Sequence, residues 1–151
     1  MLTRSATHAV RAMVALAGLQ TGEYAQTSRV AEEAGIPRNY LSKILFQLSR
    51  RGLVESQRGL GGGFRLSRDA AQISLYDVID SVEDVARWNE CAFGEKTCTE
   101  ERPCALHHRW GRVRDAYFNL LHNTFVGELI GNGPIRDLPE LAALNLQRRR
   151  Q

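Results

Sequence analysis

The 151-residue sequence predicts a mainly α-helical protein with one small β-hairpin. Apolar residues recur at three- and four-residue steps over most of the chain, as they do in helices that bury one face. Only residues 53–68 combine two short strand-like segments with a glycine-rich turn. A long helical pattern begins near residue 105, directly after a loop that holds all three cysteines. The chain therefore divides into a helical domain, a cysteine loop and a long helix.

Two helices joined by a tight turn are expected in the first half of the chain. After an opening helix over residues 3–19, Thr27 can cap a short helix that stops at Gly35, since glycine is favoured just after a helix end. Pro37 suits the first turn of the next helix, which Gly52 ends. Such a pair has the form of a helix-turn-helix.

The β-hairpin follows the second of these helices directly, and this order is the winged-helix arrangement. Leu53 to Gln57 and Phe64 to Leu66 are the expected strands, with the letters RGLGGG forming the turn. A further helix over residues 74–85 is expected, with Ser74 as N-cap and Asp77 as its acidic partner. Residues 1–85 are thus predicted to be a winged helix-turn-helix DNA-binding domain whose wing is 53–68.

The charge distribution favours a polyanionic partner for this half. Residues 1–68 carry ten Lys and Arg against four Asp and Glu, a net charge of +6, whereas residues 69–104 carry −6. In a helix-turn-helix the second helix enters the major groove with its N-terminal residues near the bases. Arg and Lys match guanine, Asn matches adenine, and Ser suits bases or phosphate. The exposed polar positions at that end are Arg38, Asn39, Ser42 and Lys43.

The segment that contains the wing is rich in arginine, and its glycine pattern argues against a nucleotide-binding loop. Arg50, Arg51, Arg58, Arg65 and Arg68 follow the second helix within nineteen residues, and Arg58 at the turn could reach the minor groove or its phosphates. The letters GLGGG lack the Lys-Ser/Thr that follows a phosphate-binding loop and open no helix. A wing that turns tightly against DNA is the better interpretation. No catalytic constellation is visible, so an enzyme is not expected.

The cysteine loop contains the candidate metal ligands. Cys91, Cys98 and Cys104 are separated by six and five residues, and His107 follows after two more. Structural zinc sites usually place ligands two to four residues apart, so zinc is possible but not favoured. Nearby glutamates should raise the thiol pKa values and discourage a reactive thiolate, whereas a bound iron centre deprotonates its thiols. Widely spaced cysteines on an irregular loop can hold an iron–sulfur cluster. His107 is the candidate fourth ligand, with His108 as the fallback, whereas His8 is expected to be structural.

The last helical pattern indicates pairing with a second copy of the chain. About 26 residues at a rise of 1.5 Å make a rod of about 39 Å, too long for a domain of this size to cover. Residues 105–131 are therefore expected to be a dimerisation helix, after a cluster-binding loop over 86–107 and before a tail over 132–151. No apolar run approaches the ~20 residues that span a bilayer. With no export signal visible, the expected compartment is the cytoplasm.

Several segments together resemble a known family. The segment RNYLSKILFQLSRRGLVESQRGLGGGFRLSR is similar to the recognition helix and wing of the bacterial regulator family that includes IscR and NsrR. THAVRAMVALA resembles the family's opening helix, and CALHHRW followed by FVGELI resembles the cluster-binding and dimer-helix region of its IscR-like members. The resemblance covers about residues 1–131. It implies a homodimeric transcription factor whose affinity for promoter DNA is tuned by an iron–sulfur cluster.

Site residues follow from the resemblance by position. It implies a [2Fe-2S] cluster on Cys91, Cys98, Cys104 and His107. The alternative that it implies is a [4Fe-4S] cluster on the three cysteines, with a first-helix residue of the partner subunit such as His8 as the fourth ligand. This sequence differs from IscR-like members in two ways. The interval between its first two cysteines is one residue longer, and Ser42 and Lys43 stand where those members have an acid–amide pair. A cluster-free thiol-redox or zinc-stabilised regulator is the other hypothesis. No membrane or small-molecule substrate is expected, and the candidate DNA contacts are Thr27, Arg38, Asn39, Tyr40, Ser42, Lys43, Arg50, Arg58 and Gly59.

Overall fold

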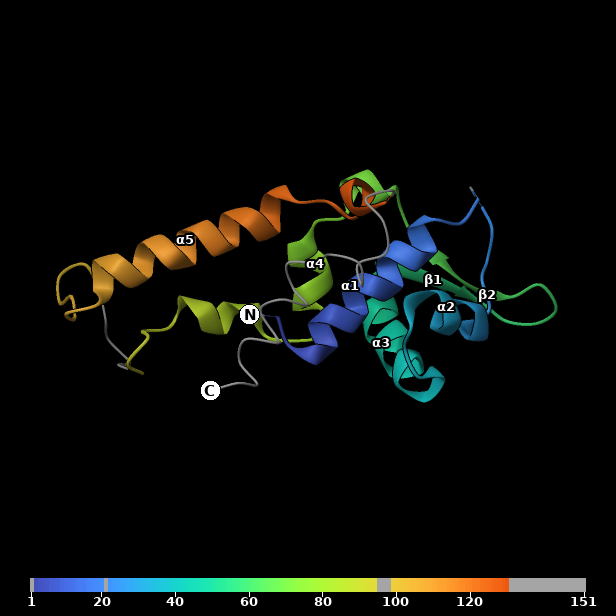
Figure 1. Ribbon diagram of the computed structural model, residues 1–151, viewed down its shortest axis with the longest axis horizontal. Coiled ribbons are helices and arrows are strands. Elements are labelled where there is room, and N and C mark those ends of the chain that lie inside the picture. The colour runs from blue at the N-terminus through green and yellow to red at the C-terminus, as the bar shows by residue number, and fades with distance from the viewer. Residues whose placement is uncertain (1, 21, 95–98, 131–151) are drawn as a thin grey trace, which may run out of the picture.

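Over the residues that the structure describes, the protein is mostly helical with one two-stranded hairpin, as the sequence predicts. The computed structural model describes residues 2–20, 22–94 and 99–130. Helices α1 to α4 and the hairpin form one group, from which α5 extends to one side (Figure 1). The elements are α1 (Arg4–Ala17), α2 (Thr27–Ala34), α3 (Arg38–Arg50), β1 (Val54–Gln57), β2 (Gly63–Leu66), η1 (Ala70–Gln72), α4 (Leu75–Asp80), η2 (Val85–Asn89), α5 (His107–Asn123) and η3 (Val126–Leu129).

The helix-turn-helix is formed by α2 and α3. Gly35 ends α2 in the left-handed conformation at φ 64°, a region that a residue without a Cβ enters at little cost. Pro37 is the N-cap of α3. Thr27, in contrast, is not a cap: α2 begins at Thr27 itself, because extended Gln26 already occupies the N-cap position without a side-chain hydrogen bond.

The core lies where α1 crosses the other helices. α1 contacts α2, α3, α4 and η3, and its face toward them is fully buried at Ala9 and Met13. Leu41, Ile44 and Leu45 bury the opposing face of α3. Burying one such side chain contributes about 1.5–3 kcal/mol, so this apolar contact fixes the orientation of α3. The remaining face of α3 is left to solvent.

The wing is tied to the rest of the domain by a second backbone pairing. β1 and β2 are antiparallel, with Val54 opposite Leu66. On its other side β2 pairs with Ala25: Ala25 N–H donates to the Phe64 carbonyl at 2.9 Å, and Phe64 N–H donates to the Ala25 carbonyl at 2.8 Å. A Cβ at Gly63 would lie 2.2 Å from the Ala25 oxygen. This position therefore requires glycine because two backbones meet there.

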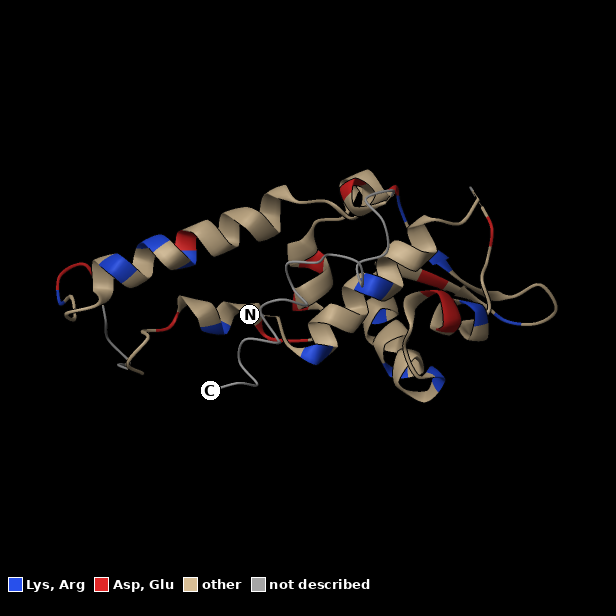
Figure 2. Cartoon of the chain, in the orientation of Figure 1, with Lys and Arg blue, Asp and Glu red and all other residues tan. Residues whose placement is uncertain are grey.

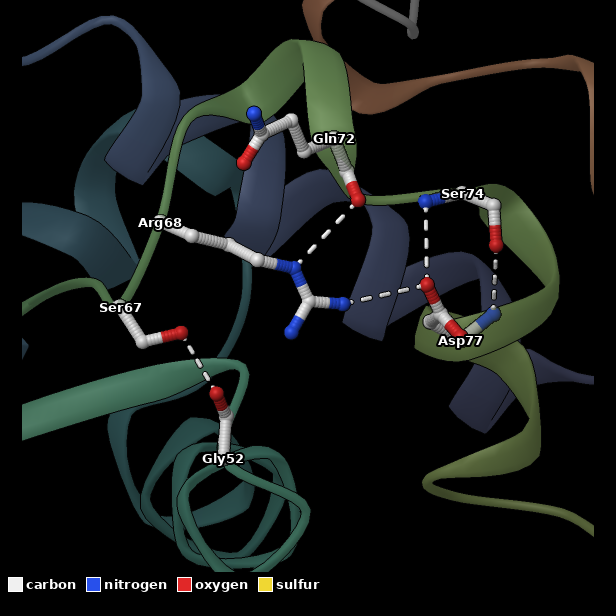
Figure 3. A network of polar contacts seen from close by, with 6 residues as sticks. All are labelled: Gly52, Ser67, Arg68, Gln72, Ser74 and Asp77. Atoms are coloured by element: carbon white, nitrogen blue, oxygen red, sulfur yellow. Dashed lines mark hydrogen bonds and ion pairs between the residues drawn. The ribbon is translucent and has the colours of Figure 1, made fainter.

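The helix α4 begins with the predicted capping box. Ser74 Oγ accepts from the Asp77 N–H at 3.1 Å, and Asp77 accepts from the Ser74 N–H at 3.3 Å. The same Asp77 carboxylate binds Arg68, which also donates to the Gln72 carbonyl (Figure 3). The helix ends at Asp80 rather than near Val85, where the 3-10 helix η2 starts.

The long C-terminal helix is shorter than the sequence predicts. α5 has 17 residues, about 26 Å, and ends at Asn123. The chain leaves the helix to form an antiparallel bridge between Phe125 and Ser74. Leu75 N–H donates to the Thr124 carbonyl at 2.8 Å, so the end of α5 is bonded to the start of α4. This tertiary pairing outweighs the continued helical periodicity. The tail, 132–151, lies outside the described residues.

Candidate DNA-binding face and cysteine site

The predicted base-reading positions share the solvent-facing side of α3. Arg38, Asn39, Ser42 and Lys43 are all exposed, whereas the residues between them are buried or half-buried. Ser42 Oγ donates back to the Arg38 carbonyl at 3.1 Å. Thr27 is half-buried at the start of α2. Lys and Arg positions recur along α3 (Figure 2), and α3 contacts the hairpin strand β1. Positive charge on the second helix suits contact with the DNA backbone and major groove.

Tyr40 connects this face to α1. Its hydroxyl lies 2.7 Å from Ser5 Oγ, and its ring packs edge-on against His8, with centroids 5.2 Å apart. His8 Nδ1 is buried without a hydrogen bond. Burial, and after it the charges of Arg11 and Arg4, lower the pKa of His8. The Tyr40 side chain thus holds the start of α3 in place as well as lying beside the candidate contacts.

The arginines from Arg50, the last residue of α3, to Arg68 fall into two groups. Three of them form ion pairs inside the domain: Arg51 with Asp80, Arg65 with Glu55, and Arg68 with Asp77. Arg65 also lies over the Tyr24 ring at 4.5 Å, and its hydrogen bond to Glu55 raises its pKa. Within the described part of the chain, Arg50 and Arg58 have no such partner. Those two are therefore available to phosphate.

The wing turn presents the second candidate group. Arg58, Gly59 and Leu60 are exposed at its tip, and Gly59 has a φ of 95° that favours glycine. A Cβ at Gly62 would lie 2.3 Å from the Gln57 carbonyl, which explains why glycine is needed where the turn closes. The glycines thus serve the turn, and they open no helix.

Phe46 is a candidate contact that the sequence analysis did not single out. It is 63% exposed on α3, one turn beyond Ser42, and the Arg50 guanidinium lies 6.0 Å from its ring centroid. With Tyr40, Lys43 and other α3 residues it lines a shallow apolar depression. The signal was available in the sequence: Phe46 falls outside the three- and four-residue spacing of the buried leucines.

The cysteine loop closes over the start of α5. Cys91 Sγ and Cys104 Sγ lie 3.8 Å apart, beyond the 2.05 Å of a disulfide bond. Both cysteines line a cavity of about 200 Å³, together with His107 and His108 from the first turn of α5. The third predicted ligand, Cys98, lies outside the described residues. Two thiols of the loop and two imidazoles of the first turn of α5 therefore line one cavity.

His107 faces a carboxylate in this structure. Its Nε2 lies 3.0 Å from Glu100 Oε1. His108 lies beside it, with ring centroids 5.2 Å apart at 90°. One donor atom from each of Glu100, His107 and His108 lies within 4.8 Å of the others. Glu100 was not predicted as part of the site, because an exposed glutamate in an acidic loop has no distinguishing signal.

Aromatic side chains attach the loop to α5. The Trp110 indole N–H donates to the Glu90 carbonyl at 3.1 Å, next to Cys91. Trp88 stacks on Trp110 with centroids 5.9 Å apart and contacts Tyr117 at 4.8 Å. The two tryptophans that flank the loop in the sequence thus stack directly on each other. It fixes η2 and the first half of α5 to each other.

Comparison with known proteins identifies the family. A sequence model described as an iron-dependent transcriptional regulator, Rrf2, matches residues 2–132. The chain belongs to the Rrf2 family. The regulator IscR of Cronobacter sakazakii is 32% identical over 139 residues, covering 92% of this chain and 85% of that protein. A regulator of Aquifex aeolicus is 30% identical over 123 residues, covering 79% and 85%.

Solved structures of Rrf2-type regulators share the fold. The oxidized form of CymR from Staphylococcus aureus has a TM-score of 0.68 and 28% identity, covering 87% of this chain and 96% of that one. IscR of T. potens has a TM-score of 0.69 at 22% identity, covering 85% of each chain. The winged-helix fold is therefore confirmed, and this Rrf2-family chain is a DNA-binding transcriptional regulator rather than an enzyme. No helix in the described ranges is long and apolar enough to cross a membrane.

Proposed function

We propose that this Rrf2-family protein is a homodimeric regulator whose affinity for promoter DNA depends on an iron–sulfur cluster. The ligands are Cys91, Cys98, Cys104 and His107, and the cluster is of the [2Fe-2S] type. Residues 1–85 bind DNA, 86–107 hold the cluster, and 105–131 pair the two copies. The protein acts on promoter DNA in the cytoplasm, and its IscR relatives support the assignment.

The distance between Cys91 Sγ and Cys104 Sγ is the single observation that carries the proposal. Two thiolates on one tetrahedral metal ion, each at about 2.3 Å, have sulfurs roughly 3.8 Å apart. Cys91 Sγ and Cys104 Sγ are 3.8 Å apart, the separation that a shared metal ion requires. Both sulfurs share a cavity with His107. The donor set of the described residues therefore fits a thiolate- and imidazole-bound iron centre.

His107 gives the site its chemical character. A cluster with histidine ligation supplies a redox centre of raised reduction potential compared with all-cysteine ligation. To act as ligand, His107 Nε2 must leave the Glu100 carboxylate, 3.0 Å away. Glu100 is highly exposed and can turn toward solvent. The contact with Glu100 keeps the imidazole of His107 at the cavity.

The signal reaches the DNA-binding half through α5. Its first turn carries His107, and Trp110 holds the carbonyl that precedes Cys91. Its last turn is bonded to α4 through the Thr124 carbonyl, and His122 stacks on Tyr76 at 4.2 Å. α4 in turn packs on α1. Movement at the cysteine loop is therefore transmitted by a helix that is anchored at both ends.

A second copy of the chain would cover the exposed face of α5. Val113 and Leu120 are apolar residues of α5, yet each is 57% exposed, whereas the neighbouring Leu121 is buried within the chain. Paired copies place two recognition helices against half-sites about one helical turn of DNA apart. A small change in their separation then alters the affinity.

The first experiment is the visible absorption spectrum of protein purified without oxygen, with iron and sulfide measured on the same sample. We expect [2Fe-2S] charge-transfer bands and two irons per chain, with both lost in Cys104→Ala. A broad [4Fe-4S]-type band would move the fourth ligand to the first helix, where His8 is the candidate. Colourless, iron-free protein would overturn the cluster and leave the DNA-binding assignment intact.

A cluster-free thiol regulator is the second candidate. CymR, which was solved in an oxidized form, is 28% identical. Cys91 and Cys104 need approach by less than 2 Å to reach disulfide distance. Under this alternative, oxidant joins these two thiols in iron-free protein and changes DNA binding. Mass spectrometry of the oxidised, iron-free chain distinguishes the two candidates, since it detects the loss of two hydrogens.

A further inference from the structure

Three side chains at the rim of the cysteine cavity have the composition of a mononuclear metal site. Glu100 comes from the loop, and His107 and His108 come from the first turn of α5. We propose that these three residues bind one late first-row divalent cation, of the Zn²⁺ or Fe²⁺ class, when no cluster is present. The cation site itself does not depend on the proposed function. Competition between the cation and the cluster rests on the proposed function.

The three donor atoms are already close to a binding geometry. The pair formed by His107 Nε2 and Glu100 Oε1 is 3.0 Å apart, and all three donors lie within 4.8 Å. Ligands about 2.1 Å from a tetrahedral ion are roughly 3.4 Å apart, so a modest inward rotation is enough. Glu100 and His108 are exposed and have the freedom to make it.

The chemistry of the set selects the metal. Imidazole nitrogens suit zinc, iron and other late first-row ions, and two of them with one carboxylate leave an open position for water. The segment that contains the loop also favours cations, because residues 69–104 together carry a net charge of −6, although the loop itself, residues 86–107, carries only −1. In the described structure the converging set contains no thiolate, since Cys91 and Cys104 are not part of it.

His107 belongs to both sites, and its Nε2 can bind only one metal at a time. A cation held by Glu100 and His108 therefore occupies the nitrogen that the proposed cluster needs. The consequence is competition: Zn²⁺ delays cluster assembly in the wild-type chain. The delay depends on Glu100 and His108, neither of which is assigned to the cluster.

The test uses Zn²⁺ as the probe on cluster-free, reduced full-length protein, with affinity measured by isothermal titration calorimetry. We expect Glu100→Gln and His108→Asn each to weaken Zn²⁺ binding at least tenfold. Glu101→Gln, a neighbouring exposed carboxylate, is the matched control and should bind as the wild type does. Cys104→Ala should also keep its Zn²⁺ affinity. Binding that survives His108→Asn but is lost in Cys104→Ala would overturn the proposal.

Co²⁺ gives an independent readout that does not depend on affinity. A site of nitrogen and oxygen donors yields d–d bands without the strong near-ultraviolet thiolate-to-cobalt transition, and the appearance of that transition would overturn the assignment. Cluster assembly then separates the two proposals. His108→Asn should assemble the cluster normally and without delay by Zn²⁺. A chain that binds Zn²⁺ as predicted but never assembles a cluster would refute the proposed function alone.

Discussion

The indole N–H of Trp110 donates to the backbone carbonyl of Glu90 at 3.1 Å, and this bond attaches the cysteine loop to α5. Cys91 is the next residue along the loop, so its sulfur position depends on that carbonyl. The stack of Trp110 on Trp88 supports the same junction from the other side. The loop is thus positioned by α5 rather than by its own regular structure.

Removing this hydrogen bond should make the bound cluster less durable. In Trp110→Phe the stacked ring is kept and the N–H donor is lost, at a cost of about 0.5–1 kcal/mol for a partly exposed bond. We expect the visible absorbance to decay in air about two- to fivefold faster than in the wild type. Trp88→Phe is the control, and an equally fast decay in both variants would contradict a role for the bond.

The two groups of arginines should differ in their effect on DNA binding. Arg58 has no ion-pair partner among the described residues, whereas Arg68 binds Asp77. Arg58→Ala should weaken binding and reduce the slope of log K against log salt by about one. Arg68→Ala should leave that slope unchanged and lower the unfolding free energy by at most about 1 kcal/mol. Fluorescence anisotropy at several salt concentrations measures the slopes, and equal slopes would refute the division.

Thymine methyl groups should contact Phe46. An exposed aromatic ring on the recognition helix can pack on the C5-methyl of thymine in the major groove. We expect replacement of the contacted thymine by deoxyuridine to weaken wild-type binding about two- to tenfold, in a site obtained by in vitro selection. Phe46→Ala should bind both DNAs equally. If no thymine position responds in the wild type, Phe46 has another role.

The capping box of α4 should contribute measurably to stability. Ser74 is 8% exposed, and its hydroxyl accepts from the Asp77 N–H. Ser74→Ala should lower the free energy of unfolding by about 1 kcal/mol. Ser74→Thr keeps the hydroxyl acceptor, so its free energy of unfolding should stay close to that of the wild type. Urea denaturation of both variants tests this, and equal losses would show that packing, not capping, is responsible.

Stability should fall at mildly acidic pH because of His8. Burial lowers its pKa in the folded protein, so below the ordinary value of 6.5 the unfolded chain binds the proton more readily. The contribution is fully present above pH 6.5 and is lost as the pH falls through that value. His8→Phe keeps a ring against Tyr40 and removes the titration. The unfolding free energy of the wild type minus that of the variant should therefore decrease from pH 7.5 to 5.5, and a constant difference would contradict the effect.

Local chemistry made the DNA-binding half predictable. Gly35 between two periodic segments indicated the helix-turn-helix, and the Ser74–Asp77 spacing indicated a capping box that the structure contains. The glycine-rich turn between Gln57 and Gly63 indicated the wing. Each signal lies within a few residues of the feature it specifies.

The features that the sequence did not reveal depend on distant partners. α5 ends early because Phe125 pairs with Ser74, some fifty residues away. Arg51 is neutralised by Asp80, from a different element, so its sequence neighbours did not distinguish it from Arg58. The predicted Thr27 cap is a local error instead: the neighbouring residue Gln26 is the N-cap, and α2 begins at Thr27 itself. Cys98 as a ligand stays a prediction.

The pairing of Ala25 with Phe64 affects the spacing of the contacts that one subunit can make along the DNA. Because β2 is bonded to the segment that leads into α2, the wing and the recognition helix belong to one folded unit. The number of base pairs between the predicted contact at the wing and the predicted contact at α3 is then constant for each subunit. In the proposed dimer, only the number of base pairs between the two halves of an operator is open to regulation.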